Sequence, residues 1–310
     1  MRRSTKLWIT AAAVLVVAFA ATVIALNATV YSAGGFVRAY LTAVSEHDAS
    51  GALSLPGVSA TGERELLESD AMGELSGIRL VSDEANGPNL RTVVFEVELA
   101  SGTELSEFSV ERTGNAWGVF QQWRFATTPL ATIEVDVTNA DSFTANGRAV
   151  STDGSFLVFT PGSYVLDHVS RVLDADAVTV TVPQPAAVAR ATVDAQATAE
   201  FETAVQAEVE RLLDECASRR VLQPAGCPFG ASIKNRVEGE PRWSVSRYPR
   251  VELERAGADW VSNNAEGVAD LRATVRSLFD GSVDEVRSAV PFDASYRVRV
   301  SGESFTVELD

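Results

Sequence analysis

The feature that most constrains this chain is an uninterrupted apolar run near its N-terminus. Residues Leu7 to Leu26 read LWITAAAVLVVAFAATVIAL, twenty residues without a charge, a proline or a glycine. As a helix the run is about 30 Å long, which matches the hydrocarbon core of a bilayer. Three basic residues precede the run: Arg2, Arg3 and Lys6. Because the next basic residue is Arg38, we expect a cytoplasmic tail over 1–6, a single transmembrane helix over 7–26 that contacts the lipid bilayer, and an extracellular remainder.

A cleaved secretory signal is the alternative interpretation, since it also combines a basic start with an apolar run. The apolar part of a signal usually spans about 7–15 residues and ends at an A-x-A-like site. This run is longer, and residues Ala25 to Ala28 match such a site poorly. We therefore expect a retained anchor, and export of the remaining chain under either interpretation.

The composition restricts the partners of the exported part. The chain carries a formal net charge of -16, which disfavours nucleic acids and anionic wall polymers. Lys6 and Lys234 are its only lysines against 24 arginines, which is typical of GC-rich bacterial genomes such as those of actinobacteria.

Cys216 and Cys227 are the only cysteines. An even number of cysteines in an exported chain favours a disulfide, which here closes a loop of about 12 residues and contributes about 3 kcal/mol. Free thiols and a metal site are the alternatives. The two histidines, His47 and His168, lie far from both cysteines in the sequence, so we predict no metal and no cofactor.

Residues 27–128 predict an α+β domain. Apolar residues recur at helical spacing in its first part: Phe36, Val37, Tyr40, Leu41 and Val44. The period then changes to two at Val93, Phe95, Val97 and Leu99, which indicates a strand. A β-hairpin follows. We expect its turn at Thr113–Asn115 and the start of its second strand at Trp117. Helices followed by antiparallel strands are typical of the α+β class.

This order, with a membrane helix in front and the G-N-A-W hairpin near the end, resembles the NTF2-like, cystatin-like domains that bacteria place outside the membrane. The resemblance covers Tyr31 to Phe125 and implies a curved sheet that forms a cone. Enzymes of that superfamily carry acids, His or Tyr inside the cone, whereas the inward positions here are apolar. Tyr40 and His47 are the only polar candidates, and we interpret both as structural.

Residues 129–184 predict a small β-sandwich. Alternating apolar residues begin at Ile133, Asn146-Gly147 indicates a hairpin turn, and Pro161-Gly162 precedes Tyr164. The succession ANGRAV, FLVFTPGSYVL and VTVTV resembles PEGA-type modules and the extracellular repeats of teicoplanin-resistance-associated membrane proteins. That resemblance implies that Gly147, Pro161, Gly162 and Tyr164 are fold-making residues.

Residues 185–310 predict a second α+β domain. An apolar stripe indicates a long helix: Phe201, Val205, Val209, Leu212, Leu213 and Cys216. Strands follow, and a closing hairpin pairs Tyr296, Val298 and Val300 with Phe305, Val307 and Leu309. The whole order is similar to the teicoplanin-associated proteins, except that their cytoplasmic zinc ribbon has no counterpart in residues 1–6.

No stretch of the sequence indicates catalysis. Asp167, His168 and either Ser163 or Ser170 have the residue types of a Ser-His-Asp catalytic triad. However, Asp167 and His168 are neighbours in a predicted strand, so their side chains should point to opposite faces. The acidic cluster Glu63, Glu65, Glu68 and Asp70, and the pair Glu96 and Glu98, are interpreted as solvated surfaces. No phosphate-binding loop, dinucleotide motif or nucleophile elbow is present.

Four aromatic residues form a candidate interface or a packed core: Trp117, Phe120, Trp123 and Phe125. The prediction is a non-enzymatic envelope protein that binds a protein partner or a wall component. The alternative is an accessory or carrier subunit that holds a lipid or another hydrophobic molecule in the cone. A cavity open toward the membrane favours the carrier, and a filled core with exposed aromatics favours the binder.

Overall fold

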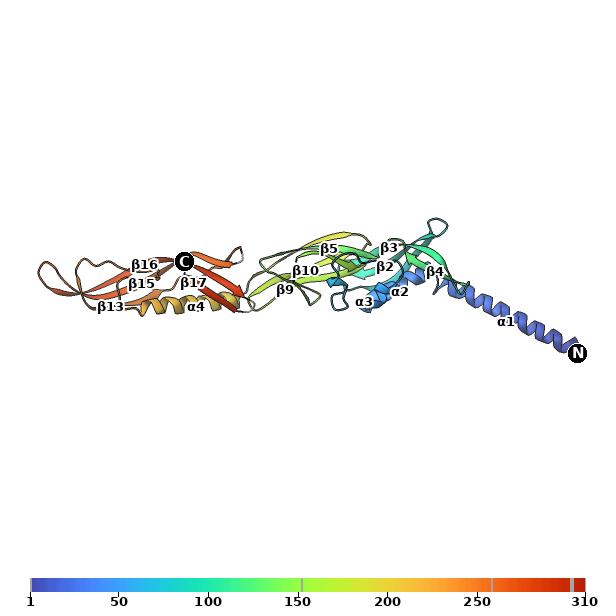
Figure 1. Cartoon of the computed structure of the whole chain (residues 1–310), viewed down its shortest axis with the longest axis horizontal. Coiled ribbons are helices and arrows are strands. Elements are labelled where there is room, and N and C mark those ends of the chain that lie inside the picture. The colour runs from blue at the N-terminus through green and yellow to red at the C-terminus, as the bar shows by residue number, and fades with distance from the viewer. Residues whose placement is uncertain (1, 152, 258, 302–303, 310) are drawn as a thin grey trace. The chain divides into compact units, whose positions relative to one another are not determined.

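The computed structural model describes residues 2–151, 153–257, 259–301 and 304–309 (Figure 1). The chain forms two compact units. The first contains Met1–His168 and Ala175–Asp194, and the second contains Val169–Asp174 and Ala195–Asp310. Both combine helices with mainly antiparallel sheets, and one parallel pair, β5 (Leu130–Thr138) with β11 (Val188–Asp194), occurs in the first unit, which confirms the α+β class.

Helix α1 (Arg2–Ala28) contains the predicted apolar run. Within the part of the chain that the structure describes, it is the one helix long and apolar enough to cross a membrane, over Trp8–Ala28. The side chains of that span are exposed rather than packed against the protein. This exposure is what a helix in lipid requires, since its surroundings are as apolar as its surface.

Two further helices follow in the first unit. Helix α2 (Ala33–Ser45) is capped by Ser32, whose side chain accepts a hydrogen bond from the Gly35 amide, and it buries the predicted stripe of Val37, Tyr40, Leu41 and Val44. Asp48 caps α3 (Ala49–Ser54) in the same way. The acidic segment that follows contains a 3-10 turn, η1 (Glu65–Leu67).

Helix α2 packs on a four-stranded antiparallel sheet. Its strands lie in sequential order: β1 (Ser76–Ala85), β2 (Leu90–Leu99), β3 (Gly102–Ala116) and β4 (Phe120–Phe125). The inward residues of β2, from Val93 to Leu99, are buried in one core with α2. The Tyr40 ring lies 5.2 Å from Phe125 and 6.1 Å from Phe108, centroid to centroid, so side chains fill the cone.

The reversal between β3 and β4 differs from the prediction. It lies at Trp117–Val119, because Trp117 and Gly118 both adopt positive φ (48° and 77°) and the Val119 amide donates to the Ala116 carbonyl at 3.1 Å. This is the geometry of a tight hairpin turn. The predicted turn residues Thr113–Asn115 remain in β3, where Gly114 marks a register shift.

The predicted small β-sandwich is present in the first unit. One sheet has the order β11-β5-β8, from β5 (Leu130–Thr138), β8 (Gly154–Phe159) and β11 (Val188–Asp194). The other has the order β10-β9-β6-β7, from β6 (Phe143–Ala145), β7 (Arg148–Val150), β9 (Gly162–Val169) and β10 (Leu173–Val182). Asn146-Gly147 forms the expected turn between β6 and β7, and Tyr164 is buried.

Strand β11 was not predicted. It follows Pro183 and Pro185 and precedes the predicted long helix, in a stretch for which we predict no strand. In the structure it pairs in parallel with β5, from Val188 beside Thr132 to Asp194 beside Thr138.

In the second unit, β12 (Gln196–Ala197) pairs with Leu173 and Asp174, and helix α4 (Ala199–Ala217) follows it. Its sheet has the order β13-β15-β16-β17: β13 (Arg236–Arg247), β15 (Asp259–Arg276), β16 (Val283–Ser301) and β17 (Ser304–Leu309), with β14 (Glu254–Ala256) beside β15. The closing hairpin has the predicted register, since Tyr296 pairs with Leu309 and Val300 with Phe305. Its turn at 302–303 lies outside the described residues. Cys216 and Cys227 form the predicted disulfide.

Candidate functional site

Tyr40, one of the two polar candidates inside the cone, is used structurally. Its hydroxyl donates to the Pro129 carbonyl at 2.6 Å and accepts from the Thr160 amide at 3.2 Å. The ring is fully buried, and this burial holds the pKa of the Tyr40 hydroxyl well above its usual value. The second candidate, His47, lies on the loop after α2, with its Nε2 at 3.4 Å from a carboxylate oxygen of Glu74.

Replacing Tyr40 with phenylalanine is expected to lower the free energy of unfolding by about 1–2 kcal/mol at neutral pH, because the buried carbonyl and amide lose a partner. Above about pH 10 the unfolded wild type releases the Tyr40 proton while the folded protein keeps it, so the stability of the wild type falls as pH rises. Tyr40→Phe lacks this hydroxyl, so its free energy of unfolding falls less over the same rise in pH. Urea unfolding at about pH 7 and about pH 11 measures the difference between the two proteins, which should shrink at the higher pH.

The residues of the imitated triad are not brought together. His168 contacts the Ser142 carbonyl through Nδ1 at 2.9 Å, and Asp167 accepts a hydrogen bond from Thr144. Ser163 Oγ accepts from the Ala100 amide at 2.9 Å. Ser170 Oγ bonds both backbone groups of Leu173, at 2.8 and 2.9 Å. Each side chain thus serves a separate local contact.

The acidic cluster before the first sheet also has structural contacts. Glu68 and Asp70 both pair with the Arg148 guanidinium of β7, at 2.8 and 2.7 Å. On the next strands, Arg79 Nε donates to Glu96 at 2.9 Å and Thr103 donates to Glu98 at 2.9 Å. Over residues 2–151, 153–257, 259–301 and 304–309, no three His, Cys, Asp or Glu side chains gather as metal ligands.

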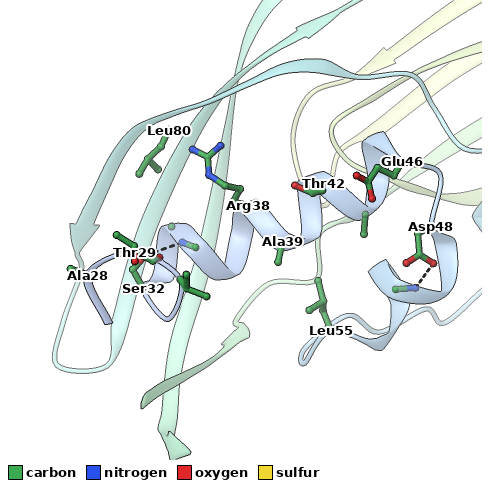
Figure 2. A pocket seen from close by; sticks show the side chains of 15 residues that line it. Ala28, Thr29, Ser32, Arg38, Ala39, Thr42, Glu46, Asp48, Leu55 and Leu80 are labelled. Carbon is green, nitrogen blue, oxygen red and sulfur yellow. Dashed lines mark hydrogen bonds between the residues drawn. The ribbon is translucent and has the colours of Figure 1, made fainter. Parts of the chain in front are cut away.

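A groove of about 840 Å³ lies outside the cone, along the face of α2 that does not pack on the sheet. Figure 2 shows Arg38, Ala39 and Thr42 of α2 along it, followed by Glu46 at the C-cap of the helix, with Leu55 and Leu80 beside them. The end of α1 and the connection to α2 complete the lining, through Ala28, Thr29, Val30 and Ser32. We call this feature the α2 groove.

Small residues form the floor of the α2 groove. Gly35, Ala39 and Ala43 recur every fourth residue and therefore lie on one face of α2. Gly35 is required by the fold as well, because a Cβ there would lie 2.3 Å from the Thr29 carbonyl oxygen. Since the chain's own Thr29–Val30 backbone occupies the space beside Gly35, it is the short side chains of Ala39 and Ala43 that allow another backbone to approach closely.

Charges of both signs border the floor. The Arg38 guanidinium lies 5.3 Å above the centre of the Phe95 ring, which fixes its position at the upper edge (Figure 2). Asp48 accepts hydrogen bonds from the Gly51 amide and the Ser50 hydroxyl, both at 2.9 Å, and these lower its pKa, so it is ionised at neutral pH. Together with Glu46, these groups suit a partner that is apolar along its centre and charged at its edges.

The four aromatic residues of the candidate interface divide into two pairs. Trp123 and Phe125 are core residues, 7% and 3% exposed, and Trp123 Nε1 donates to the Tyr31 carbonyl at 2.9 Å. Trp117 is 86% exposed, and its ring packs edge-on against the half-buried Phe120 at 6.2 Å. Only Trp117 and part of Phe120 are thus available to a partner.

The α2 groove was not predicted. Its sequence signal is the spacing of four between Gly35, Ala39 and Ala43, which lies beside the stripe that identified the buried face of α2. The walls come from α3 and β1, so the groove exists only once these elements have packed.

Comparisons with known proteins identify no family for this chain. No protein-family model and no curated protein matches the chain. Among solved structures, an "Ntf2 like protein involved in plasmid conjugation" aligns over 77% of this chain and 78% of its own, at 11% identity and a TM-score of 0.15. The proposed likeness to teicoplanin-resistance-associated proteins is not supported by any of these matches.

Proposed function

We propose that this chain is a non-enzymatic protein of the cell envelope, anchored by α1 with its N-terminus in the cytoplasm, and that the α2 groove binds an apolar helical segment of another membrane protein. The observation that carries the proposal is the lining of the groove. Ala28 is both the last residue of the apolar span and part of the groove wall. With α1 in a bilayer, the groove opens at the membrane surface, where a partner's membrane helix emerges.

Two further observations support this function. The disulfide between Cys216 and Cys227 suits an oxidising compartment outside the cytoplasm. The polar groups singled out as catalytic candidates serve hydrogen bonds and ion pairs within the fold, as described for Tyr40 and His168. Neither observation requires a chemical reaction.

The filled cone favours a binding role over a carrier role. A carrier needs an empty apolar cavity, whereas Tyr40, Phe108 and Phe125 occupy the interior of this cone with mutual ring contacts. The free apolar surface lies on the opposite side of α2, in a groove open to solvent.

A photo-crosslinking amino acid at Thr42, in the groove, tests the proposal in intact membranes. We expect one discrete adduct, joined through an apolar segment of a second membrane protein. The same amino acid at Glu107, an exposed position of β3 outside the groove, is the matched control and should give none. Ala39→Trp fills the floor and should lower the adduct yield about fivefold, as expected for about 1 kcal/mol of lost affinity, while Glu107→Trp leaves it unchanged.

Several outcomes contradict the proposal. An adduct of twice the mass of this chain identifies a second copy as the occupant, and an adduct with lipid alone identifies a lipid site. Equal yields from Thr42 and Glu107, or a yield insensitive to Ala39→Trp, show that the groove is not the contact surface.

A further inference from the structure

The tip of the β3–β4 hairpin is bonded directly to the end of α1. The Asn27 side-chain amide donates to the Val119 carbonyl at 2.7 Å, and its oxygen accepts from the Gln121 amide at 2.9 Å. Asn27 lies one residue before the end of the apolar span at Ala28. The hairpin tip is therefore held at the level where α1 leaves the bilayer, if α1 spans it.

The side chains at this level are aromatic and apolar. Tyr31, three residues beyond the span, stacks on Phe120 with 4.4 Å between ring centroids, and Phe120 also makes an edge-on contact with Trp117. Val30 and Val119 are exposed beside them. Tryptophan and tyrosine are enriched at this depth in membrane proteins, because their rings are apolar and their N–H or O–H reaches the headgroups.

The backbone at Trp117 shows that the fold does not favour this residue. Its φ of 48° is disfavoured for a bulky side chain, and glycine or asparagine is usual at such a turn position. The exposed indole contributes few contacts within the protein beyond the edge of Phe120. A tryptophan in this position thus requires an explanation outside the folded chain.

We propose that the hairpin tip Trp117–Val119 inserts into the interface between headgroups and acyl chains, as a second membrane contact beside α1. The inference rests on the proposed anchoring function. Insertion is apolar in origin, since the acidic body offers no attraction for anionic lipids. With two contacts, α1 and the tip, the first unit would have a fixed orientation at the bilayer, and the α2 groove would open along its surface.

Tryptophan fluorescence of the full chain in vesicles of phosphatidylcholine brominated near the acyl carbonyl ends tests the insertion. Bromine quenches only tryptophans that it contacts. Removing a quenched tryptophan lowers the quenched fraction of the total emission, and removing an unquenched one raises it. We expect Trp117→Phe and Trp8→Phe each to lower this fraction.

The two variants separate the possible failures. If Trp8→Phe lowers the quenched fraction while Trp117→Phe raises it, α1 is in the bilayer and the tip is not, which overturns the inference alone. If Trp8→Phe raises it, the anchor itself is wrong, and the inference falls with the proposed function.

Trp117→Gly tests the alternative that the Trp117 side chain stabilises the folded protein rather than contacting lipid. Glycine adopts the positive φ of this position without strain, so the thermal unfolding midpoint in detergent should stay equal or rise. A clear fall of the midpoint would show that the indole stabilises the folded chain, and would remove the reason for placing it in lipid.

Discussion

Replacing Trp123 with alanine is expected to destabilise the first unit by about 3–5 kcal/mol. The side chain extends from β4 into the core that the sheet shares with α2, and its truncation leaves a cavity and an unpaired Tyr31 carbonyl. The sequence leaves two interpretations of Trp123 open, a residue of an exposed interface or a residue of a packed core, and its burial supports the second.

Urea unfolding of the full chain in detergent measures this effect, with hydrogen exchange of peptides from β2 to β4 as the local readout. At a slope of about 2 kcal/mol per molar urea, the midpoint should fall by about 1.5 M or more. Trp117→Ala is the matched control, because it removes the same side chain from an exposed site and should shift the midpoint little. Equal shifts for both variants would contradict the assignment of Trp123 to the core.

Replacing both cysteines with alanine is expected to destabilise the second unit by about 3 kcal/mol, through the added entropy of the unfolded chain. The disulfide joins the last turn of α4 to the loop after it, over a separation of 11 residues. Cys216 is buried beside Leu213, so alanine also leaves a small void there.

The same unfolding experiment, read from peptides of α4 and β13, checks this prediction. Wild type treated with a reductant should lose about as much stability as the double variant, and the double variant should not respond to the reductant. Peptides from β2 to β4 should keep their midpoint in both cases. An unchanged midpoint for α4 would show that the disulfide does not contribute to stability.

The elements predicted correctly are those whose own side-chain pattern decides their structure. The stripes on α2 and α4 follow from apolar residues at helical spacing, and the closing hairpin follows from alternation on both sides of a short turn. The turn at Asn146-Gly147 was predictable because asparagine and glycine both tolerate the positive φ that a two-residue hairpin turn requires.

The elements that were missed depend on partners distant in sequence. Strand β11 is stabilised by pairing with β5, more than fifty residues earlier, and its own sequence gives little signal after two prolines. The β3–β4 turn falls at Trp117 rather than at Gly114, because the register with β4 decides it. The α2 groove likewise requires α1, α3 and β1 to be packed around one helix.

The candidate interface shows the same limit. Trp117, Phe120, Trp123 and Phe125 are close in sequence, but the pleat of β4 and the turn before it place Trp123 and Phe125 in the core, leave Phe120 half-buried and expose Trp117 to solvent. Side chains alternate between the two faces of the sheet along β4, so Phe125 can be assigned to the core only when it is known which face points inward.

Protease accessibility in intact cells tests the central claim, that α1 stays in the membrane and carries the folded body outside. The cells express the full chain with an epitope at its C-terminus, and an established surface protein serves as the digestion control. We expect the epitope to be lost while a fragment containing α1 remains in the membrane fraction. An epitope that survives under conditions that digest the surface protein would contradict the claim.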